Sequence, residues 1–362
     1  MTQPGKKSGI CSDPAGNFEC LDLDHPDWDA LVRKCREWHP FYLSGFVSTE
    51  AAFHQADGQL LVFRAGEEIA VYPVLAFAFR NGKTITYDLR GQPYAGPISS
   101  AADSSCHSGL LNGLRSAMSE MAETRGWITD FCRLNPFIST PLPEQHVSHV
   151  SSHVYVDFTR GYERIRKEYR PSARRDVKRA KESRVELRPL ANEAEHRSFA
   201  DLYQRRMVEL GASPRYCFDH AYLAALNRNL RHHCLTLGAF VDDRLAGASL
   251  NLRGNGYMFA YFAAVDSAYR RFGLNHGLHD LAIRIGLRDG YKAYVLGGGV
   301  RGEDSVYSYK RSLSPAVFSQ VRLNIVLDRE HYEQLCAQCT VQEESTDFFP
   351  PYRQEKAGSH AA

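Results

Sequence analysis

The chain has 362 residues, of which 43% are hydrophobic and 24% are charged, and its formal net charge is +2. This composition is typical of a globular protein and excludes disordered and fibrous classes, and the length suffices for two ordinary domains. No run approaches the roughly 18 consecutive apolar residues that a membrane helix requires, and no apolar stretch follows the N-terminal lysines. We therefore expect a cytoplasmic protein without a membrane span.

The cysteines favour free thiols, because the chain contains nine of them at scattered positions. Cys336 and Cys339 form the one Cys-x-x-Cys pair, and a structural zinc site would need two further ligands. We therefore predict no metal and no bound cofactor.

Apolar periodicity and turn signals predict strands, a helix and further strands in the first half of the chain. Asn81-Gly82, between two apolar runs, is a strong hairpin signal. The predicted elements are a polar lead-in over 1–20, a helix over 27–38, strands over 59–64, 68–74, 76–80 and 83–88, a helix over 109–125, and strands over 127–134 and 154–158.

The second half repeats this pattern. Its elements are a basic helix over 162–183 interrupted near Pro171, a strand over 185–188, helices over 199–210 and 220–229, strands over 235–241, 244–252 and 257–264, a helix over 274–289 ended by Gly290, and strands over 294–296 and 316–327. We therefore predict mixed α/β sheets in two domains, over 21–155 and 156–339, followed by a polar tail over 340–362.

Residues 160–184 carry eleven Arg or Lys against four acids, so this segment has a charge of +7 and the remaining residues sum to −5. One concentrated basic segment in a near-neutral chain indicates a local anionic partner, although a solvated helix face is the alternative. The candidate contacts are Arg174, Arg175, Lys178, Arg179 and Lys181.

Arg270 and Gly273 lie in a loop that follows a predicted strand and opens a predicted helix. Glycine lets backbone N–H groups approach a phosphate, and the helix N-terminus adds partial positive charge. These two residues match an Arg-x-x-Gly-x-Gly pyrophosphate loop, but Asn275 replaces its second glycine. An ordinary strand–helix turn is the alternative.

The strand over 294–296 runs into Gly297, Gly298 and Gly299, which leave room for a ligand beside the backbone. Lys310 follows at the end of an alternating stretch over 306–310. A lysine ammonium at this place would stabilise the oxyanion of a tetrahedral intermediate. We therefore predict that the three glycines line a substrate site and that Lys310, with Tyr309, is catalytic.

The order of these motifs resembles that of the Fem family, whose members are aminoacyl transferases with two GNAT-like domains. The family's Phe-Lys pair corresponds to Tyr309-Lys310, and its aromatic-Gly-Gly-Pro turn corresponds to Tyr94-Ala95-Gly96-Pro97. Its basic helix and Gly-Val strand correspond to 174–185, with Arg184 where glycine is usual. The resemblance spans roughly residues 35–325 and implies tandem GNAT-like domains in a compact form without a helical-hairpin insertion.

The resemblance also implies a function. An N-acyltransferase of this type transfers an aminoacyl group from aminoacyl-tRNA to the amine of a peptidoglycan precursor or natural-product intermediate. tRNA and an amine are then the partners of a monomer, Tyr309 shapes the acceptor pocket, and Arg215 and Tyr216 bind the acceptor. An acyl-CoA-dependent N-acetyltransferase, favoured by Arg270 and Gly273, and an inactive anion-binding module are the alternatives.

His276 and His279 lie one turn apart at the start of a predicted helix. No aspartate has a spacing that would orient either ring on the same helix face, so we expect both histidines to be structural.

Overall fold

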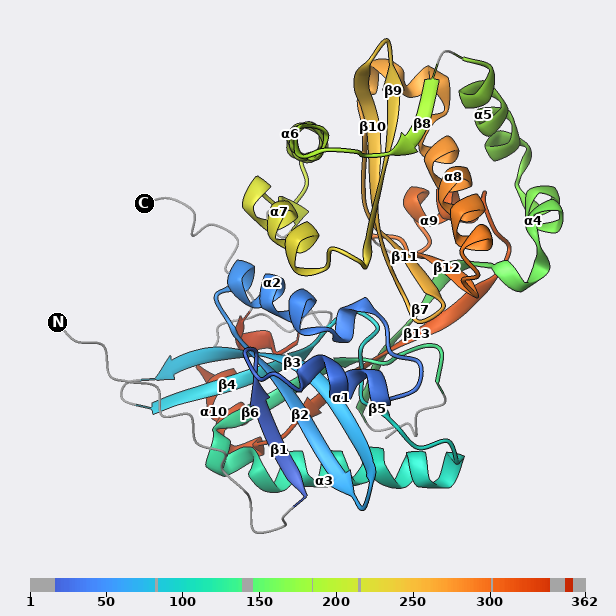
Figure 1. Cartoon of the computed structure of the whole chain (residues 1–362). Coiled ribbons are helices and arrows are strands. Elements are labelled where there is room, and N and C mark those ends of the chain that lie inside the picture. The colour runs from blue at the N-terminus through green and yellow to red at the C-terminus, as the bar shows by residue number, and fades with distance from the viewer. Residues whose placement is uncertain are drawn as a thin grey trace. The chain divides into compact units, whose positions relative to one another are not determined.

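The computed structural model describes residues 17–81, 84–138, 146–183, 185–213, 216–300, 302–338 and 349–353. The chain forms two compact units (Figure 1). Unit 1 comprises Met1–Val150 together with Val321–Ala362, and unit 2 comprises Ser151–Gln320. The predicted division therefore differs at its end, because residues 321–338, which we assigned to the C-terminal domain, belong to unit 1.

Unit 1 contains a sheet of order β1-β2-β3-β4-β6-β13, in which β4 and β6 are parallel and the other neighbours are antiparallel. The strands are β1 (Phe18–Asp22), β2 (Asp57–Ala65), β3 (Glu68–Asn81), β4 (Thr84–Gly91), β6 (Trp127–Arg133) and β13 (Val317–Val326), with β5 (Ile98–Ser99) paired to β3. The helices are α1 (Trp28–Lys34), η1 (Pro40–Tyr42), α2 (Ser44–His54), α3 (Ser104–Arg125), α10 (Arg329–Ala337) and η6 (Pro351–Arg353).

Helix α3 connects the parallel strands β4 and β6, and its two ends follow from the sequence. Asp103 caps the N-terminus by accepting hydrogen bonds from the backbone N–H groups of Ser105 and Cys106, both 2.9 Å long. Gly126 ends the helix in the left-handed conformation that favours glycine, with φ of 66°. Between the caps, Leu110 and Leu114 lie in the core of unit 1.

Residues 349–353 pack against unit 1, although we predicted a polar tail over 340–362. Tyr352 is buried, and its hydroxyl donates to the carboxylate of Asp88 on β4 over 2.6 Å. The Arg353 guanidinium pairs with the same carboxylate and donates to the backbone oxygen of Phe77. This contact involves residues far apart in the sequence, so polarity alone could not predict it.

Unit 2 contains a sheet of order β7-β12-β11-β10-β9-β8, in which β11 and β12 are parallel and the other neighbours are antiparallel. The strands are β7 (Val147–Asp157), β8 (Val185–Pro189), β9 (Cys234–Val241), β10 (Arg244–Gly254), β11 (Tyr257–Val265) and β12 (Ala293–Gly297). The helices are η3 (Phe158–Arg160), α4 (Tyr162–Glu168), α5 (Pro171–Glu182), α6 (Glu193–Glu209), α7 (His220–Asn229), η5 (Ser267–Phe272), α8 (Leu274–Arg288) and α9 (Ser305–Lys310).

Strands β9 and β10 are apolar on both faces because helices cover both faces. Figure 1 shows α6 and α7 on one side of these strands and α8, with α5 beyond it, on the other. Seven of the eight residues of β9 are buried, so its near-continuous apolar run belongs to a central strand. Pro171 begins α5 at a position where proline is tolerated, and this explains the predicted interruption of the basic helix.

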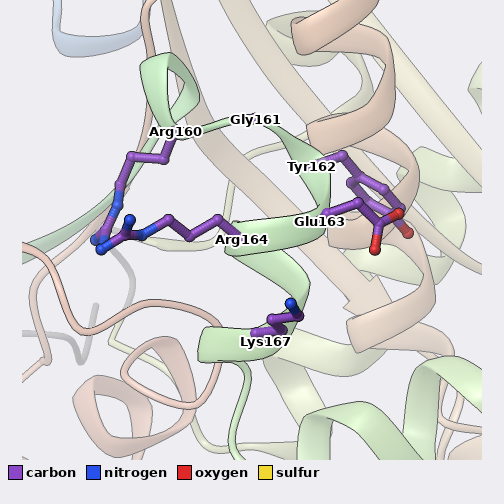
Figure 2. Close-up of a pocket in the computed structure, with 6 residues that line it drawn as sticks. All are labelled: Arg160, Gly161, Tyr162, Glu163, Arg164 and Lys167. Atoms are coloured by element: carbon purple, nitrogen blue, oxygen red, sulfur yellow. The ribbon is translucent and has the colours of Figure 1, made fainter.

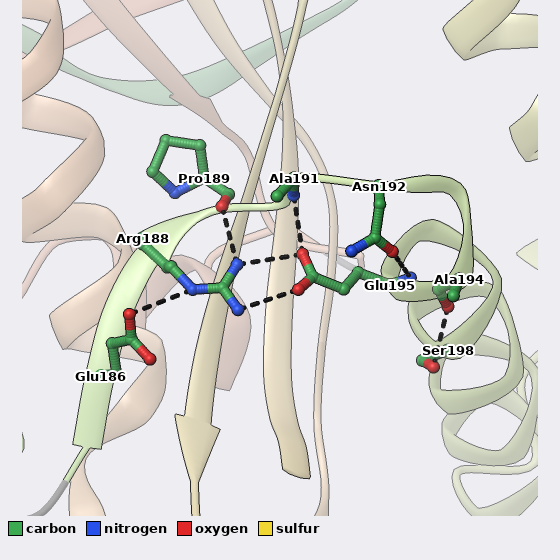
Figure 3. A network of polar contacts seen from close by, with 8 residues as sticks. All are labelled: Glu186, Arg188, Pro189, Ala191, Asn192, Ala194, Glu195 and Ser198. Carbon is green, nitrogen blue, oxygen red and sulfur yellow. Dashed lines mark hydrogen bonds and ion pairs between the residues drawn. The ribbon is translucent and has the colours of Figure 1, made fainter. Parts of the chain in front are cut away.

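The N-terminus of α6 is fixed by a polar network around Glu195 (Figure 3). The carboxylate of Glu195 accepts two hydrogen bonds from the Arg188 guanidinium, at 2.8 and 3.0 Å, and one from the backbone N–H of Ala191. The Arg188 hydrogen bonds are the main reason that the pKa of Glu195 falls to about 2. Asn192 caps the helix by accepting from the backbone N–H of Glu195. This network connects β8 to α6.

The two units repeat one topology: three antiparallel strands, a crossover helix, and a strand parallel to the third. In unit 1 this is β2-β3-β4-α3-β6, and in unit 2 it is β9-β10-β11-α8-β12. The closing strands are exchanged, since β7 follows β6 in the sequence but pairs with β12, and β13 follows β12 but pairs with β6. Apolar alternation identifies such a strand without revealing its partner, and our predicted C-terminal domain therefore differs from unit 2 from residue 321 onward.

Candidate active site

The three glycines at the end of β12 form a tight turn around Asp304. Gly297 has φ of 83°, and a Cβ atom on Gly299 would lie 2.1 Å from the backbone oxygen of Gly302. The Asp304 carboxylate accepts from the backbone N–H of Val300 over 2.8 Å and also caps α9. Only glycine fits this close approach, so the three glycines determine the shape of the turn. The predicted contact of these glycines with a substrate stays a prediction.

Lys310 lies at the end of α9, and its ammonium is directed back to the glycine turn. Its Nζ atom donates to the backbone oxygen of Gly298 over 2.7 Å. Burial lowers the pKa of Lys310 to about 8, although the negative charge of Asp304 acts in the opposite direction. The lysine is therefore mostly protonated at neutral pH, in an environment of reduced polarity where its charge acts strongly.

Tyr309 precedes Lys310, and its ring contacts both histidines of α8. The ring centroids are 4.7 Å from that of His276 and 5.9 Å from that of His279. The hydroxyl oxygen is buried and has no hydrogen-bond partner among the described residues. Burial raises the pKa of Tyr309 well above its usual range, so the hydroxyl keeps its proton.

His276 lies between an aspartate of α5 and a serine that follows α9. Its Nδ1 atom is 2.8 Å from Oδ2 of Asp176, and its Nε2 atom is 2.8 Å from Oγ of Ser312. The Ser312 hydroxyl also contacts the backbone oxygen of Tyr309 at 2.5 Å. Burial lowers the pKa of His276, partly offset by Asp176. This chain of contacts connects α5, α8 and α9 beside Lys310.

His279 belongs to a second buried chain that continues into the sheet. Its Nδ1 atom is 2.9 Å from the hydroxyl of Tyr294 on β12, and that hydroxyl donates to Oδ1 of Asn251 on β10. Burial is the main reason that the pKa of His279 falls to about 3, and the charge of Lys310 contributes in the same direction. Both histidines are therefore held neutral and oriented by partners outside their own helix face, which the spacing along α8 could not indicate.

Asp280 is a buried carboxylate that joins α4, α5 and α8. The hydroxyls of Tyr162 and Tyr169 donate to it, at 3.0 and 3.3 Å. Three cations surround it: Arg166 at 3.9 Å, Lys181 at 3.6 Å and Arg284 at 3.3 Å. Removing a partner from a buried carboxylate is strongly destabilising, and the cluster connects the two basic helices to α8.

The five predicted tRNA contacts on α5 differ in their surroundings. Lys181 pairs with Asp280, Lys178 with Glu182 at 3.5 Å, and Arg179 with Asp176 at 3.0 Å. Arg174 and Arg175 are exposed, and in the described part of the chain neither has an acidic partner within 4.0 Å. The buried face of α5 consists of Ala173, Val177 and Ala180. Arg174 and Arg175 are therefore the predicted contacts whose charge is not neutralised within the protein.

The predicted diphosphate loop lies at the start of α8. Arg270 is exposed in η5, and Gly273 is buried with φ of 69°. A Cβ atom on Gly273 would lie 2.6 Å from the backbone oxygen of Asp176, so this glycine allows α5 to pack against α8. Pairing between β11 and β12 ends after Phe259 and Val295, just before the glycine turn.

The loop between α6 and α7 contains Tyr216, which is 39% exposed, and its backbone oxygen accepts from the hydroxyl of Tyr203. Arg215 lies outside the described residues. Neither observation assigns an acceptor contact to this loop. Cys336 is not in a disulfide with any described cysteine, Cys339 lies outside the described part of the chain, and no cluster of metal ligands occurs within that part.

A shallow cavity of about 540 Å³ lies at the start of α4. Figure 2 shows the Arg160 and Arg164 side chains converging on one side of the helix, while Tyr162 and Glu163 point to the other. Both arginines pair with Glu168, at 2.6 and 4.0 Å. The lining residues do not include any from β12 or α9, so this cavity is separate from the glycine turn.

Asp176, His276 and Ser312 were not predicted as functional residues. They are separated by 100 and 36 positions in the sequence, and no local motif connects them.

Among the described residues, no helix combines the length and the hydropathy that a membrane span requires.

Comparison with known proteins identifies the family of the second half. Residues 163–311 match the family described as "Acetyltransferase (GNAT) domain". A search of curated proteins found no match to the sequence. Among solved structures, FemX is similar with a TM-score of 0.65 at 10% sequence identity, over 87% of this chain and 99% of FemX.

Two further structures share the fold. A conserved protein of unknown function from Bacteroides thetaiotaomicron VPI-5482 has a TM-score of 0.54 at 10% identity, over 85% of this chain and 99% of its own. L-PGS from Bacillus licheniformis has a TM-score of 0.51 at 9% identity, over 85% and 93%. The predicted tandem GNAT-like fold of mixed α/β sheets is confirmed. The protein is thus an acyltransferase in which residues 163–311 form a GNAT acetyltransferase domain, within a fold similar to that of FemX.

Proposed function

We propose that the protein transfers an aminoacyl group from aminoacyl-tRNA to an acceptor amine and forms an amide. The observation that carries this proposal is the partly buried ammonium of Lys310 beside the glycine turn at the end of β12. A cation held in a partly dehydrated site stabilises the oxyanion of a tetrahedral intermediate without reorganisation. A peptidoglycan precursor or a small-molecule intermediate would supply the amine.

The reaction needs one nucleophile, one leaving group and one centre of negative charge. The acceptor nitrogen attacks the ester carbonyl, the new C–N bond forms, and the carbonyl oxygen becomes an oxyanion facing Lys310. The C–O bond to the tRNA ribose then breaks, and the proton lost by the nitrogen is matched by the proton gained by the ribose oxygen. No redox change and no metal ion enter this balance.

The exposed face of α5 supports tRNA as the donor. Arg174 and Arg175 directly precede Asp176, which contacts His276 at the candidate site. Phosphates bound to these arginines would therefore lie on a helix that is itself connected to α9. In contrast, Gly273 at the start of α8 is already covered by the Asp176 backbone, which gives this glycine a packing role that needs no diphosphate.

Salt dependence of tRNA binding tests the donor. We expect affinity for charged total tRNA to fall steeply with salt, because bound phosphates release counterions. The double variant Arg174→Gln/Arg175→Gln should reduce the slope of log K against log salt by about 2. Lys178→Gln is the matched control, since Lys178 already pairs with Glu182. Equal slopes for the double variant and the wild type would contradict these contacts.

A product search tests the reaction. The protein is incubated with charged total tRNA and the small-molecule fraction of a cell extract, and new amides are sought by mass spectrometry. Acetyl-CoA replaces the tRNA in a parallel sample. Amides formed from acetyl-CoA alone, with a rise in melting temperature on adding coenzyme A, would instead establish the acyl-CoA alternative, which the GNAT match favours. If neither donor gives a product, the remaining alternative is an inactive anion-binding module.

A further inference from the structure

The hydroxyl of Tyr309 has no role in holding the structure together. Its oxygen is buried without a hydrogen-bond partner among the described residues, and a buried unpaired hydroxyl costs stability. We propose that this hydroxyl donates a hydrogen bond to a polar atom of the acceptor substrate, close to the amine that reacts. The proposal rests on the proposed acyl transfer and adds a specificity determinant to it.

Three of the four ring nitrogens of the histidines around Tyr309 have hydrogen-bond partners of their own. The two nitrogens of His276 contact Asp176 and Ser312, so neither is available to the hydroxyl. Nδ1 of His279 contacts Tyr294, whose own hydroxyl donates to Asn251. The Tyr309 hydroxyl has no partner among the described residues, and we assign that role to a bound substrate.

The ring of Tyr309 is held in place. It packs against both histidines, and its backbone oxygen contacts the Ser312 hydroxyl. Tyr309 is on α9, whose N-terminus is capped by Asp304. A hydroxyl fixed in this way binds a substrate atom with little loss of conformational freedom.

The substrate atom bound by Tyr309 differs from the one that faces Lys310. Consecutive residues of a helix point in directions about 100° apart, because a turn contains 3.6 residues. We therefore assign the Tyr309 hydroxyl to a substrate atom other than the oxyanion that faces the Lys310 ammonium. Since the hydroxyl stays protonated, it suits a hydrogen-bond acceptor, and a carbonyl oxygen next to the amine is the chemical class that we assign.

Two tyrosine-to-phenylalanine variants on the same helix provide a matched test. Tyr309→Phe removes the unpaired hydroxyl and keeps the ring. Tyr307→Phe removes a hydroxyl that pairs with Ser152 Oγ at 2.8 Å. In the absence of substrate, we expect Tyr309→Phe to melt at or above the wild-type temperature and Tyr307→Phe to melt below it. A lower melting temperature for Tyr309→Phe would show that its hydroxyl is bonded in the free protein and would overturn the proposal.

The substrate arm uses two amines with charged total tRNA. Alaninamide has a carbonyl beside its amine, and sec-butylamine has an ethyl group at that place. The ratio of kcat/KM for alaninamide to that for sec-butylamine should fall three- to tenfold in Tyr309→Phe and stay within twofold in Tyr307→Phe. Comparing ratios between variants cancels the different intrinsic reactivities of the amines.

The two arms separate the proposal from the function on which it rests. An unchanged ratio in Tyr309→Phe would overturn the carbonyl contact while leaving acyl transfer intact. If wild-type protein transfers nothing to either amine, the proposed reaction is in question, but the melting comparison still decides whether the Tyr309 hydroxyl lacks a partner in the free protein.

Discussion

Strands β6 and β12 occupy equivalent places in the two repeats, yet the residues that follow them differ in chemistry. Beyond β6, the buried amide of Asn135 donates to the backbone oxygen of Glu37 and to the Tyr42 hydroxyl, and accepts from the backbone N–H of Phe137. Beyond β12, the glycine turn leads to a partly buried ammonium and to a hydroxyl without a partner among the described residues. One topology thus supports a satisfied structural end and the end at which we propose the reaction, because function depends on the site and not on the fold.

Removing the charge beyond β12 should have the largest effect. Lys310→Met keeps the length and apolar stem of the side chain but loses the ammonium, and we expect the rate of acyl transfer to fall by roughly 10² or more. The rate is measured with saturating donor and acceptor. Thermal unfolding close to that of the wild type would show that the loss is local, whereas near-wild-type turnover would remove Lys310 from the mechanism.

The pH dependence should report the same lysine with a smaller effect. Since its pKa is lowered to about 8, the ammonium is present below that pH and is lost as the pH rises through it. We expect a descending limb of kcat/KM near pH 8, of up to tenfold per pH unit. Lys310→Arg keeps its charge and should lack this limb, so an identical limb in that variant would assign the titration to another group.

The contribution of Lys310 to the stability of the protein should rise with pH, whereas its contribution to kcat/KM should fall. Its pKa in the folded protein lies below the ordinary value of 10.5, so between about pH 8 and 10.5 the unfolded chain binds more protons than the folded one. The contribution of Lys310 to the free energy of unfolding therefore rises with pH across this window. The wild type should show this trend relative to Lys310→Met in denaturant titrations.

Substitution beyond β6 should affect folding and leave the chemistry unchanged. Asn135→Ala removes three hydrogen bonds from a buried site, and we expect a loss of about 2 kcal/mol in the free energy of unfolding. Turnover per folded molecule should stay within twofold of the wild type. A specific loss of turnover in the folded variant would mean that the two strand ends are not as different in role as their contacts indicate.

Local patterns in the sequence predicted most of the elements, because caps and apolar periods are local properties. Gly290 and Pro171 mark helix ends as expected, and the meander of β9, β10 and β11 is confirmed. Helix α2 was not predicted, since its apolar residues are mixed with small polar ones. The alternation over 306–310 resembles a strand, but the Asp304 cap makes it helical.

The candidate site was only partly predictable, because local patterns do not show which distant residues come into contact. Lys310 and the glycines belong to one short segment, in which Tyr309-Lys310 corresponds to the Phe-Lys pair of the Fem family. The contacts of His276 with Asp176 and Ser312 depend on the packing of α5 and α9 against α8, which no spacing within one helix reveals. The separation of Arg174 and Arg175 from the paired cations of α5 also depends on tertiary neighbours.

The exchange of β7 and β13 has a consequence for synthesis on the ribosome. Strand β6 gains its neighbour β13 only when residues 322–326 have been translated, after the whole of unit 2. Unit 2 is continuous in the sequence and can collapse as soon as residue 320 leaves the exit tunnel, while unit 1 waits with an open sheet edge. A nascent chain stalled when residue 320 has left the exit tunnel, with residues 321–326 still inside it, should therefore contain a protease-resistant second half and a protease-sensitive first half.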